Sequence, residues 1–290
     1  MKQGVNAFLD YLLIERKLSK NTIAAYRNDL FQLADYIQDK DPSPQWSKVD
    51  RQLILNYYRD LTERGYARAT VARKVAAVKS LFKFLVNTGV VKDTPIEGLP
   101  SPRVRKSLPQ PLSVAQVMEL LKQPEKHLTP EAKRDKAMLE LLYASGMRVS
   151  ELMSLDLEDI NLQEKTASCL VRGSKGRTIT VRRETIPSLQ KYLAEARPQL
   201  ARHKEEQALF LNRLGDRLTR QGFWQIIKTY AKEAKLSARV TPYTLRHSFA
   251  AHMLSQGVDL RSVQQSLGHA NISTTQVYTQ LAKHPSKKGL

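Results

Sequence analysis

The sequence predicts a mainly α-helical protein of two domains, with a small β-hairpin in the second domain. Apolar residues recur at helical spacing in most segments between breaker residues. A stretch rich in proline and basic residues, 101–111, has no periodic apolar pattern and is typical of a semi-extended linker. Two short segments at 167–172 and 177–182 flank the sequence GSKG, which is a hairpin signal.

Four amphipathic helices account for the expected N-terminal domain, residues 1–100. The first carries an apolar stripe that runs from Val5 to Leu13. Ser19 is a suitable N-cap for the second helix, which must end before the breaker cluster DPSP at 41–44. The third is expected to span about 50–64, because a glycine follows it directly.

The fourth helix of this domain combines an apolar stripe, from Val71 to Leu85, with a strongly basic remainder. No acidic residue stands near the bases on its other faces, which are Arg68, Arg73, Lys74, Lys79 and Lys83. Such a pattern is usually a solvated face. Contact with phosphates explains it equally well, and such contacts would position the protein on a duplex without reading its bases. We therefore expect Arg68, Arg73 and Lys79 to bind DNA.

The second domain, residues 112–290, is also expected to be mainly helical. Ser113 precedes an amphipathic segment and is a natural cap, and a helix at 133–145 should stop at Gly146. Further helices are predicted at 186–196, 219–234, 244–255 and 260–267. Thr219, Arg220 and Gln221 begin one of them. Arg220 and Gln221 suit recognition of guanine and adenine in a major groove, although the same helix N-terminus could simply hold a phosphate.

Composition restricts the function further. The net charge is +19, from 47 basic and 28 acidic residues, which indicates a polyanionic partner such as nucleic acid or a membrane surface. No apolar run reaches the length of a membrane span, and an acidic residue comes too early for a signal peptide. Cys169 alone allows no internal disulfide and no cysteine-based metal site. We expect a cytoplasmic DNA-binding protein without a membrane, metal or cofactor requirement.

Two arginines, a histidine and a tyrosine form a set suited to phosphodiester chemistry. Arg148 lies in SGMRVSEL, Arg246 in TLRHSFAAHML, and His269 in LGHA, with Tyr278 nine residues later (278 − 269 = 9). Guanidinium forks can neutralise the phosphoryl oxygens of the transition state, and a histidine can donate to them or take up a proton. A tyrosine nucleophile would conserve the bond energy as a phosphotyrosyl ester, so that a second hydroxyl could reverse the reaction without ATP.

Lys175 at the hairpin tip could complete this set by protonating the leaving 5′ oxygen. Arg172 and Arg177 flank it as rivals for the role, and a lysine at a hairpin tip is more often simply solvated. Glu151 lies three residues after Arg148 and is suited to orienting that arginine. The other histidines, including His247 and His252, are interpreted as structural.

The three segments SGMRVSEL, TLRHSFAAHML and LGHANISTTQVYT closely resemble the motifs of tyrosine recombinases, in particular the bacterial and archaeal Xer recombinases. The resemblance implies catalytic roles for Arg148, Lys175, Arg246, His269 and Tyr278. One position departs from the pattern, because the family usually has histidine or lysine where this chain has Tyr243. A tyrosine there could still bond the phosphate, but it is no near-neutral acid or base.

The resemblance also implies an architecture and partners. A helical core-binding domain of SAM-like type and a catalytic domain would form a C-shaped clamp around double-stranded DNA. The expected assembly is a homo-tetramer on two DNA sites, or a hetero-tetramer with a related recombinase, with an activating protein as a further partner. Chromosome dimer resolution is the expected task. Two alternatives stay open: a phage, integron or transposon integrase or a topoisomerase with the same chemistry, and a catalytically weak accessory factor.

Overall fold

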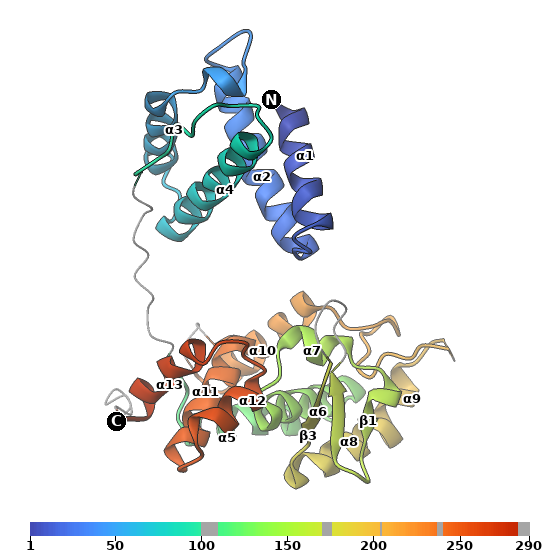
Figure 1. Ribbon diagram of the computed structural model, residues 1–290. Helices are drawn as coiled ribbons and strands as arrows, with labels where there is room; N and C mark the ends of the chain where they lie inside the picture. The colour runs from blue at the N-terminus through green and yellow to red at the C-terminus, as the bar shows by residue number, and fades with distance from the viewer. Residues whose placement is uncertain (100–109, 170–175, 204, 237–239, 284–290) are drawn as a thin grey trace. The chain divides into compact units, whose positions relative to one another are not determined.

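The chain divides into two compact units, Met1–Lys106 and Ser107–Leu290, each with its own hydrophobic core (Figure 1). The computed structural model describes residues 1–99, 110–169, 176–203, 205–236 and 240–283. Most of the predicted linker lies outside these ranges. No helix within them is both long enough and apolar enough to cross a membrane.

The first unit is a cluster of four α-helices, as the sequence predicts. They are α1 (Lys2–Ile14), α2 (Lys20–Gln38), α3 (Arg51–Glu63) and α4 (Arg68–Asn87). The Ser19 side chain accepts a hydrogen bond from the Thr22 backbone N–H and so caps α2, and Asp50 caps α3 in the same way through Leu53. The apolar stripes of α1, α2 and α4 meet in one core. Leu13 is an exception: it lies at the end of the first stripe but is 44% exposed.

Part of the basic surface expected on α4 is in fact internal. Lys74 is buried and donates to the carboxylate of Asp29, which is itself buried on α2. Arg73 also pairs with Asp29. One acidic residue of a neighbouring helix therefore pairs with two of the five bases. The composition of α4 alone cannot indicate this arrangement, because Asp29 is distant in the sequence.

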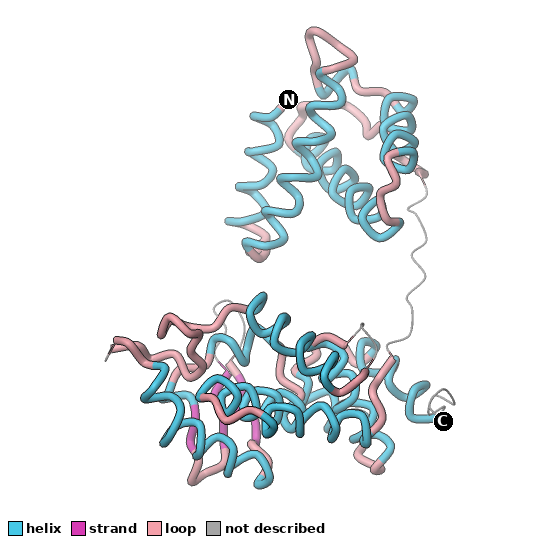
Figure 2. The backbone as a smooth tube through the Cα atoms, turned by 180° about the vertical axis from the view of Figure 1, so that it is seen from behind, coloured by secondary structure: helices cyan, strands magenta, loops and turns pink. Residues whose placement is uncertain are grey.

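The second unit is mainly helical, with a small antiparallel sheet at one edge (Figure 2). Its α-helices are α5 (Val114–Lys122), α6 (Pro130–Ser145), α7 (Val149–Ser154), α8 (Ile186–Lys191), α9 (Arg197–Leu200), α10 (Arg220–Glu233), α11 (Pro242–Ser255), α12 (Leu260–Leu267) and α13 (Ser273–Lys283). The predicted helix at 186–196 continues from α8 through a π-helical segment, Tyr192–Ala196, into α9. The helices predicted from the sequence do not include α7 or α13.

The sheet has one more strand than the predicted hairpin. Strands β1 (Ile160–Asn161), β2 (Thr166–Cys169) and β3 (Arg177–Thr180) pair in the order β1-β2-β3, with Cys169 opposite Arg177. The hairpin prediction is therefore confirmed for the two longer strands. The hairpin tip between them, residues 170–175, lies outside the described residues.

Helix α11 organises the part of the second unit that carries the predicted motifs. It packs against α6, α12 and α13, and Figure 1 shows α11, α12 and α13 grouped together. Two glycines with positive φ end the neighbouring helices, Gly146 (φ 60°) after α6 and Gly268 (φ 61°) after α12. These left-handed caps turn the chain immediately before Arg148 and His269, and so direct both residues toward α11.

Candidate active site

Arg246 lies on α11 and is 5% exposed. Its guanidinium donates hydrogen bonds to two backbone carbonyls at the ends of neighbouring helices, Gly146 O and Leu267 O, the second at 2.5 Å. Burial, reinforced by the nearby charge of Arg148, lowers the pKa of Arg246 to about 10, which leaves it protonated at neutral pH. The contacts use two of its five N–H donors, so the others remain for a ligand.

Arg148 precedes α7 and is held by the carboxylate of Glu151. Its backbone N–H donates to Glu151 Oε2 at 2.6 Å, and its side chain donates to Oε1 at 2.9 Å and to Gly268 O at 2.5 Å. Arg177 on β3 donates to the same carboxylate, at 2.9 Å to Oε2, and to the carbonyls of Gln265 and Ser266 at the end of α12. Glu151 therefore orients two arginines, which agrees with the role expected from its spacing.

His269 follows the left-handed Gly268 and lies close to α13. Its Nδ1 lies 3.0 Å from Thr275 Oγ1, and its ring is nearly parallel to that of Tyr278, with the centroids 6.5 Å apart. Burial and the charges of Arg246 and Arg148 lower the pKa of His269 to about 4, so the imidazole is neutral at pH 7. With the Thr275 hydroxyl donating to Nδ1, Nε2–H is the donor that remains for a phosphate oxygen.

Tyr278 lies on α13 and is 4% exposed. Its hydroxyl is 2.6 Å from Nδ1 of His247, a residue of α11 that the sequence analysis interpreted as structural. Burial raises the pKa of Tyr278, and the charge of Arg246 opposes this effect. The structure thus brings Arg148, Arg246, His269 and Tyr278 together, although as many as 130 residues separate them in the chain (278 − 148 = 130).

Of the two other predicted catalytic residues, the structure describes only Tyr243. Tyr243 lies in the first turn of α11 and is 65% exposed, and it makes no hydrogen bond to the four clustered residues in the part of the chain that is described. Lys175 lies outside the described residues. Its suggested rival Arg177 is committed to Glu151 and to the end of α12. His247 is the functional candidate that sequence reasoning missed; its position next to Arg246 was the only available signal.

The predicted DNA-binding residues fall into two groups. Arg68, Arg220 and Gln221 are exposed at the first turns of α4 and α10, where basic and amide groups can reach a ligand. Arg73 and Lys79 are engaged within the first unit, the former with Asp29 and the latter with the carbonyl of Leu99 at 2.6 Å. DNA contact by any of the five stays a prediction.

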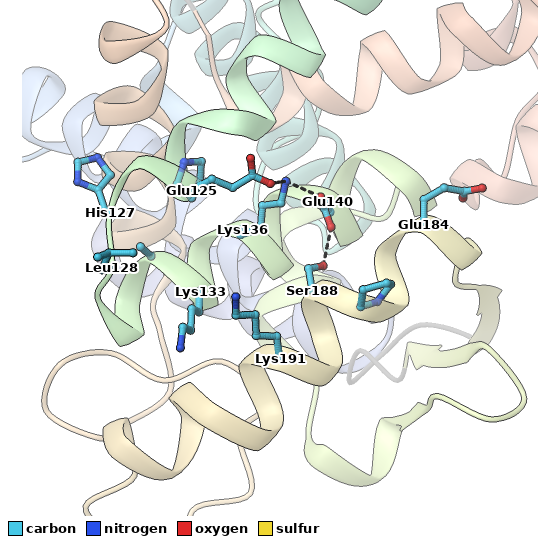
Figure 3. A pocket seen from close by; sticks show the side chains of 12 residues that line it. Glu125, His127, Leu128, Lys133, Lys136, Glu140, Glu184, Ser188 and Lys191 are labelled. Carbon is cyan, nitrogen blue, oxygen red and sulfur yellow. Dashed lines mark hydrogen bonds and ion pairs between the residues drawn. The ribbon is translucent and has the colours of Figure 1, made fainter.

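A separate cavity of about 410 Å³ lies between the start of α6 and α8, and its lining includes none of these residues (Figure 3). Lys136 in its wall donates to Glu125 at 2.6 Å and to Glu140 at 2.9 Å. Ser188 also donates to Glu140. The positive charge of Lys136 is thus neutralised by carboxylates, which makes this cavity a poor site for a phosphate.

Comparison with known proteins assigns the cluster to a family. The model described as "Phage integrase family" matches residues 110–284, and that described as "Phage integrase, N-terminal SAM-like domain" matches residues 5–89. "Tyrosine recombinase XerC" of Herpetosiphon aurantiacus is 48% identical over 99% of this chain and 94% of its own length. The chain belongs to the phage integrase family, as a tyrosine recombinase of the Xer type. It is therefore an enzyme that cuts and rejoins DNA at specific sites.

The recombinase also resembles "Tyrosine recombinase XerD" of Oceanobacillus iheyensis, which is 42% identical over 98% of this chain and 95% of the relative. Its fold matches the crystal structure of the XerH site-specific recombinase bound to palindromic difH substrate, with a TM-score of 0.78, 22% identity, and coverage of 93% of this chain and 79% of that one. The expected fold class, mainly α-helical with a small sheet, is confirmed.

Proposed function

We propose that Tyr278 attacks the scissile phosphate and forms a 3′-phosphotyrosyl intermediate, which is then rejoined to a partner strand. The convergence of Arg148, Arg246 and His269 on Tyr278 carries this proposal. The two guanidiniums and the neutral His269 imidazole supply N–H donors to the non-bridging oxygens, where negative charge increases in the transition state. Lys175 protonates the leaving 5′ oxygen. These roles agree with those that the family motifs imply.

The arrangement in the structure is closed to DNA. Tyr278 is 4% exposed, and its hydroxyl is 2.6 Å from Nδ1 of His247. A phosphate of duplex DNA can reach the hydroxyl only if the groups that cover Tyr278 move aside. We infer that DNA binding, or an activating protein, opens this site before cleavage.

The substrate is a double-stranded recombination site, and the assembly is a tetramer on two such sites. Support comes from the net charge of +19, from the exposed Arg68 and Arg220, and from the full-length likeness to XerC and XerD proteins. Resolution of chromosome dimers is the biological task that we propose for this recombinase.

Trapping on a nicked suicide duplex tests the nucleophile. The cognate site is first obtained by binding selection at controlled salt, because affinity for DNA varies steeply with salt concentration. We expect wild type to form a covalent protein–DNA adduct and Tyr278→Phe to form none while binding the site equally well. A duplex bound tightly by wild type without any adduct would contradict autonomous catalysis. The protein would then be an accessory factor or an enzyme that requires its activating protein.

A two-site substrate tests the purpose of the chemistry. Recombination gives exchanged products, whereas a topoisomerase rejoins each strand to its original partner. We expect exchanged strands and a four-way junction intermediate when two copies of the selected site are present. Relaxation of supercoiled DNA without any exchange would contradict the recombinase assignment of the reaction.

A further inference from the structure

His247 is the group that contacts the reacting atom of Tyr278. Its Nδ1 lies 2.6 Å from the Tyr278 hydroxyl oxygen, and the two ring centroids are 5.5 Å apart. Provided that Tyr278 is the nucleophile, as proposed above, we propose that His247 is the general base that accepts its proton during cleavage. This catalytic residue adds a proton path to the roles assigned to the arginines and to His269.

The positions of the two side chains are set by helices that pack together. His247 lies on α11 directly after Arg246, and Tyr278 lies on α13, which packs along α11. A neutral imidazole can carry its proton on Nε2 and leave Nδ1 unprotonated. In that tautomer the Tyr278 hydroxyl donates the hydrogen bond and Nδ1 of His247 accepts it. The distance of 2.6 Å between the two atoms is short enough for direct transfer of the proton.

The charge state of the pair permits transfer in this direction. Burial, followed by the adjacent charge of Arg246, lowers the pKa of His247, so that the imidazole is neutral at pH 7 and able to accept. The charged and titratable groups that face it are Arg246 on its own helix and His269 and Tyr278 on the elements packed against α11. Tyr278 needs such a base, because burial raises the pKa of its phenol.

The other candidates for this role are occupied or distant. Nδ1 of His269 is engaged with the Thr275 hydroxyl at 3.0 Å, and its ring is stacked beside that of Tyr278 without a hydrogen bond between them. Tyr243 is four residues before His247 on α11, but it is 65% exposed. Within the described part of the chain, His247 is the side chain that bonds the Tyr278 hydroxyl.

The step balances without a further reactant. The Tyr278 O–H bond breaks and its proton passes to Nδ1 of His247, while the phenolic oxygen forms a bond to phosphorus. The bond between phosphorus and the 5′ oxygen breaks, and that oxygen takes a proton from the general acid, which is Lys175 in the proposed function. In the rejoining step the 5′ hydroxyl attacks phosphorus and gives its proton to the now neutral amine of Lys175. The bond between phosphorus and the phenolic oxygen breaks, and the His247 imidazolium returns its proton to the departing phenolate.

The rate of adduct formation on the nicked suicide duplex tests this role. We expect His247→Ala to form the adduct roughly 10²–10³-fold more slowly at pH 7, which is within the range of general base catalysis. His247→Asn should be equally slow, although its amide can keep a hydrogen bond to Tyr278, because an amide cannot take up the proton. The matched control is His252→Ala, on the same helix, whose imidazole contacts Tyr143 and which should keep the wild-type rate.

Three further readouts separate proton transfer from positioning. Added imidazole should partly restore the rate of His247→Ala. A fluorotyrosine at position 278 has a more acidic phenol and depends less on a general base. It should therefore reduce the difference in the rate of adduct formation between proteins with His247 and with His247→Ala. The rate of the variant should also rise with pH, as hydroxide replaces the missing base, whereas the wild-type rate levels off once His247 is neutral.

The possible failures are distinguishable. His247→Asn at the wild-type rate would show that a hydrogen bond suffices, and faster adduct formation by His247→Ala would show that His247 only keeps Tyr278 buried. Either result overturns this role and leaves Tyr278 as nucleophile. Loss of rate without rescue by imidazole or fluorotyrosine would also overturn it. Absence of any wild-type adduct on tightly bound site DNA would overturn autonomous cleavage by Tyr278 together with the role of His247 in it.

Discussion

Arg246 illustrates at the residue scale why side-chain shape matters in this site. A planar fork can hold the carbonyls of Gly146 and Leu267 and still present N–H groups to a phosphate. We expect Arg246→Lys, which has one compact charge, to slow adduct formation about 10²–10³-fold, with little effect on DNA affinity. Arg213→Lys, at an exposed side chain paired with Glu131, is the matched control and should behave as wild type. Equal rates for the two variants would contradict the role of the fork.

Glu151 predicts a pH dependence of stability. Burial alone would raise its pKa, but hydrogen bonds from Arg177 and Arg148 outweigh burial and hold the pKa below the usual 4.5. A lowered pKa in the folded state means that the carboxylate stabilises the fold above pH 4.5, and that this contribution is lost as the pH falls through the folded value.

We therefore expect Glu151→Gln to lower the Tm at pH 7, with a difference from wild type that shrinks as the pH is lowered below about 4.5. Thermal unfolding of the second unit, followed from pH 7 to pH 3, measures this. Glu195→Gln is the control, because Glu195 makes an exposed pair with Lys133 and should change the Tm little. A constant difference between Glu151→Gln and wild type at all pH values would contradict the ionic role.

Tyr243 is the site residue whose predicted role the geometry supports least. Its hydroxyl is exposed at the first turn of α11. We expect Tyr243→Phe to form the adduct within about tenfold of the wild-type rate, since a neutral hydroxyl bond contributes about 1 kcal/mol. A loss as large as that of Arg246→Lys would instead mean that Tyr243 turns toward the phosphate when DNA binds.

At the scale of elements, the turn between α6 and α7 is the feature on which the site depends most directly. Gly146 has φ 60°, and a Cβ added there would lie 2.2 Å from Cδ1 of Phe249 on α11. We expect Gly146→Ala to destabilise the second unit by about 2–4 kcal/mol, from the left-handed backbone and from overpacking together. The Gly146 carbonyl accepts a hydrogen bond from the Arg246 guanidinium. A shift of this turn should therefore displace Arg246 and slow adduct formation as well.

Gly65 provides the matched control for this turn. It also has a left-handed backbone, with φ 75°, but no atom lies within 4 Å of an added Cβ. Gly65→Ala should therefore cost only about 1–2 kcal/mol. Denaturant unfolding, with one probe in each unit, gives both values. Equal costs for the two glycines would show that Phe249 moves aside freely, and that the close approach of α6 and α11 is not a constraint.

At the scale of the whole molecule, the charge of +19 predicts how binding depends on salt. If six to ten phosphates are neutralised, affinity for DNA falls about 10³–10⁵-fold between 50 and 200 mM salt. The substitution Arg68→Ala removes one exposed contact to a phosphate. It should reduce the salt slope, which is the slope of the logarithm of the binding constant against the logarithm of the salt concentration, by about one. Arg213→Ala, whose partner is Glu131, should leave the slope unchanged. A slope that Arg68→Ala does not alter would remove Arg68 from the DNA interface.

Local features of the sequence predicted most of the secondary structure. The caps at Ser19 and Ser113, the stop at Gly146 and the apolar stripes each act within a few residues, so they can be recognised without a fold. Helix α13 was missed because STTQVYTQLAK has few apolar residues, and it is stabilised by packing against α11 and α12. The short strand β1 depends in the same way on pairing with β2.

The sequence by itself determined the mainly helical class and the division into two compact units. It also predicted the set of Arg148, Arg246, His269 and Tyr278, which the structure brings together. Tertiary structure alone decided that Lys74 is buried against Asp29, that Tyr243 faces solvent, and that His247, one turn later, meets Tyr278. The physical reason is distance along the chain. Periodicity places a residue on a face of its own helix, but only the packing of α11 against α6, α12 and α13 determines what that face contacts.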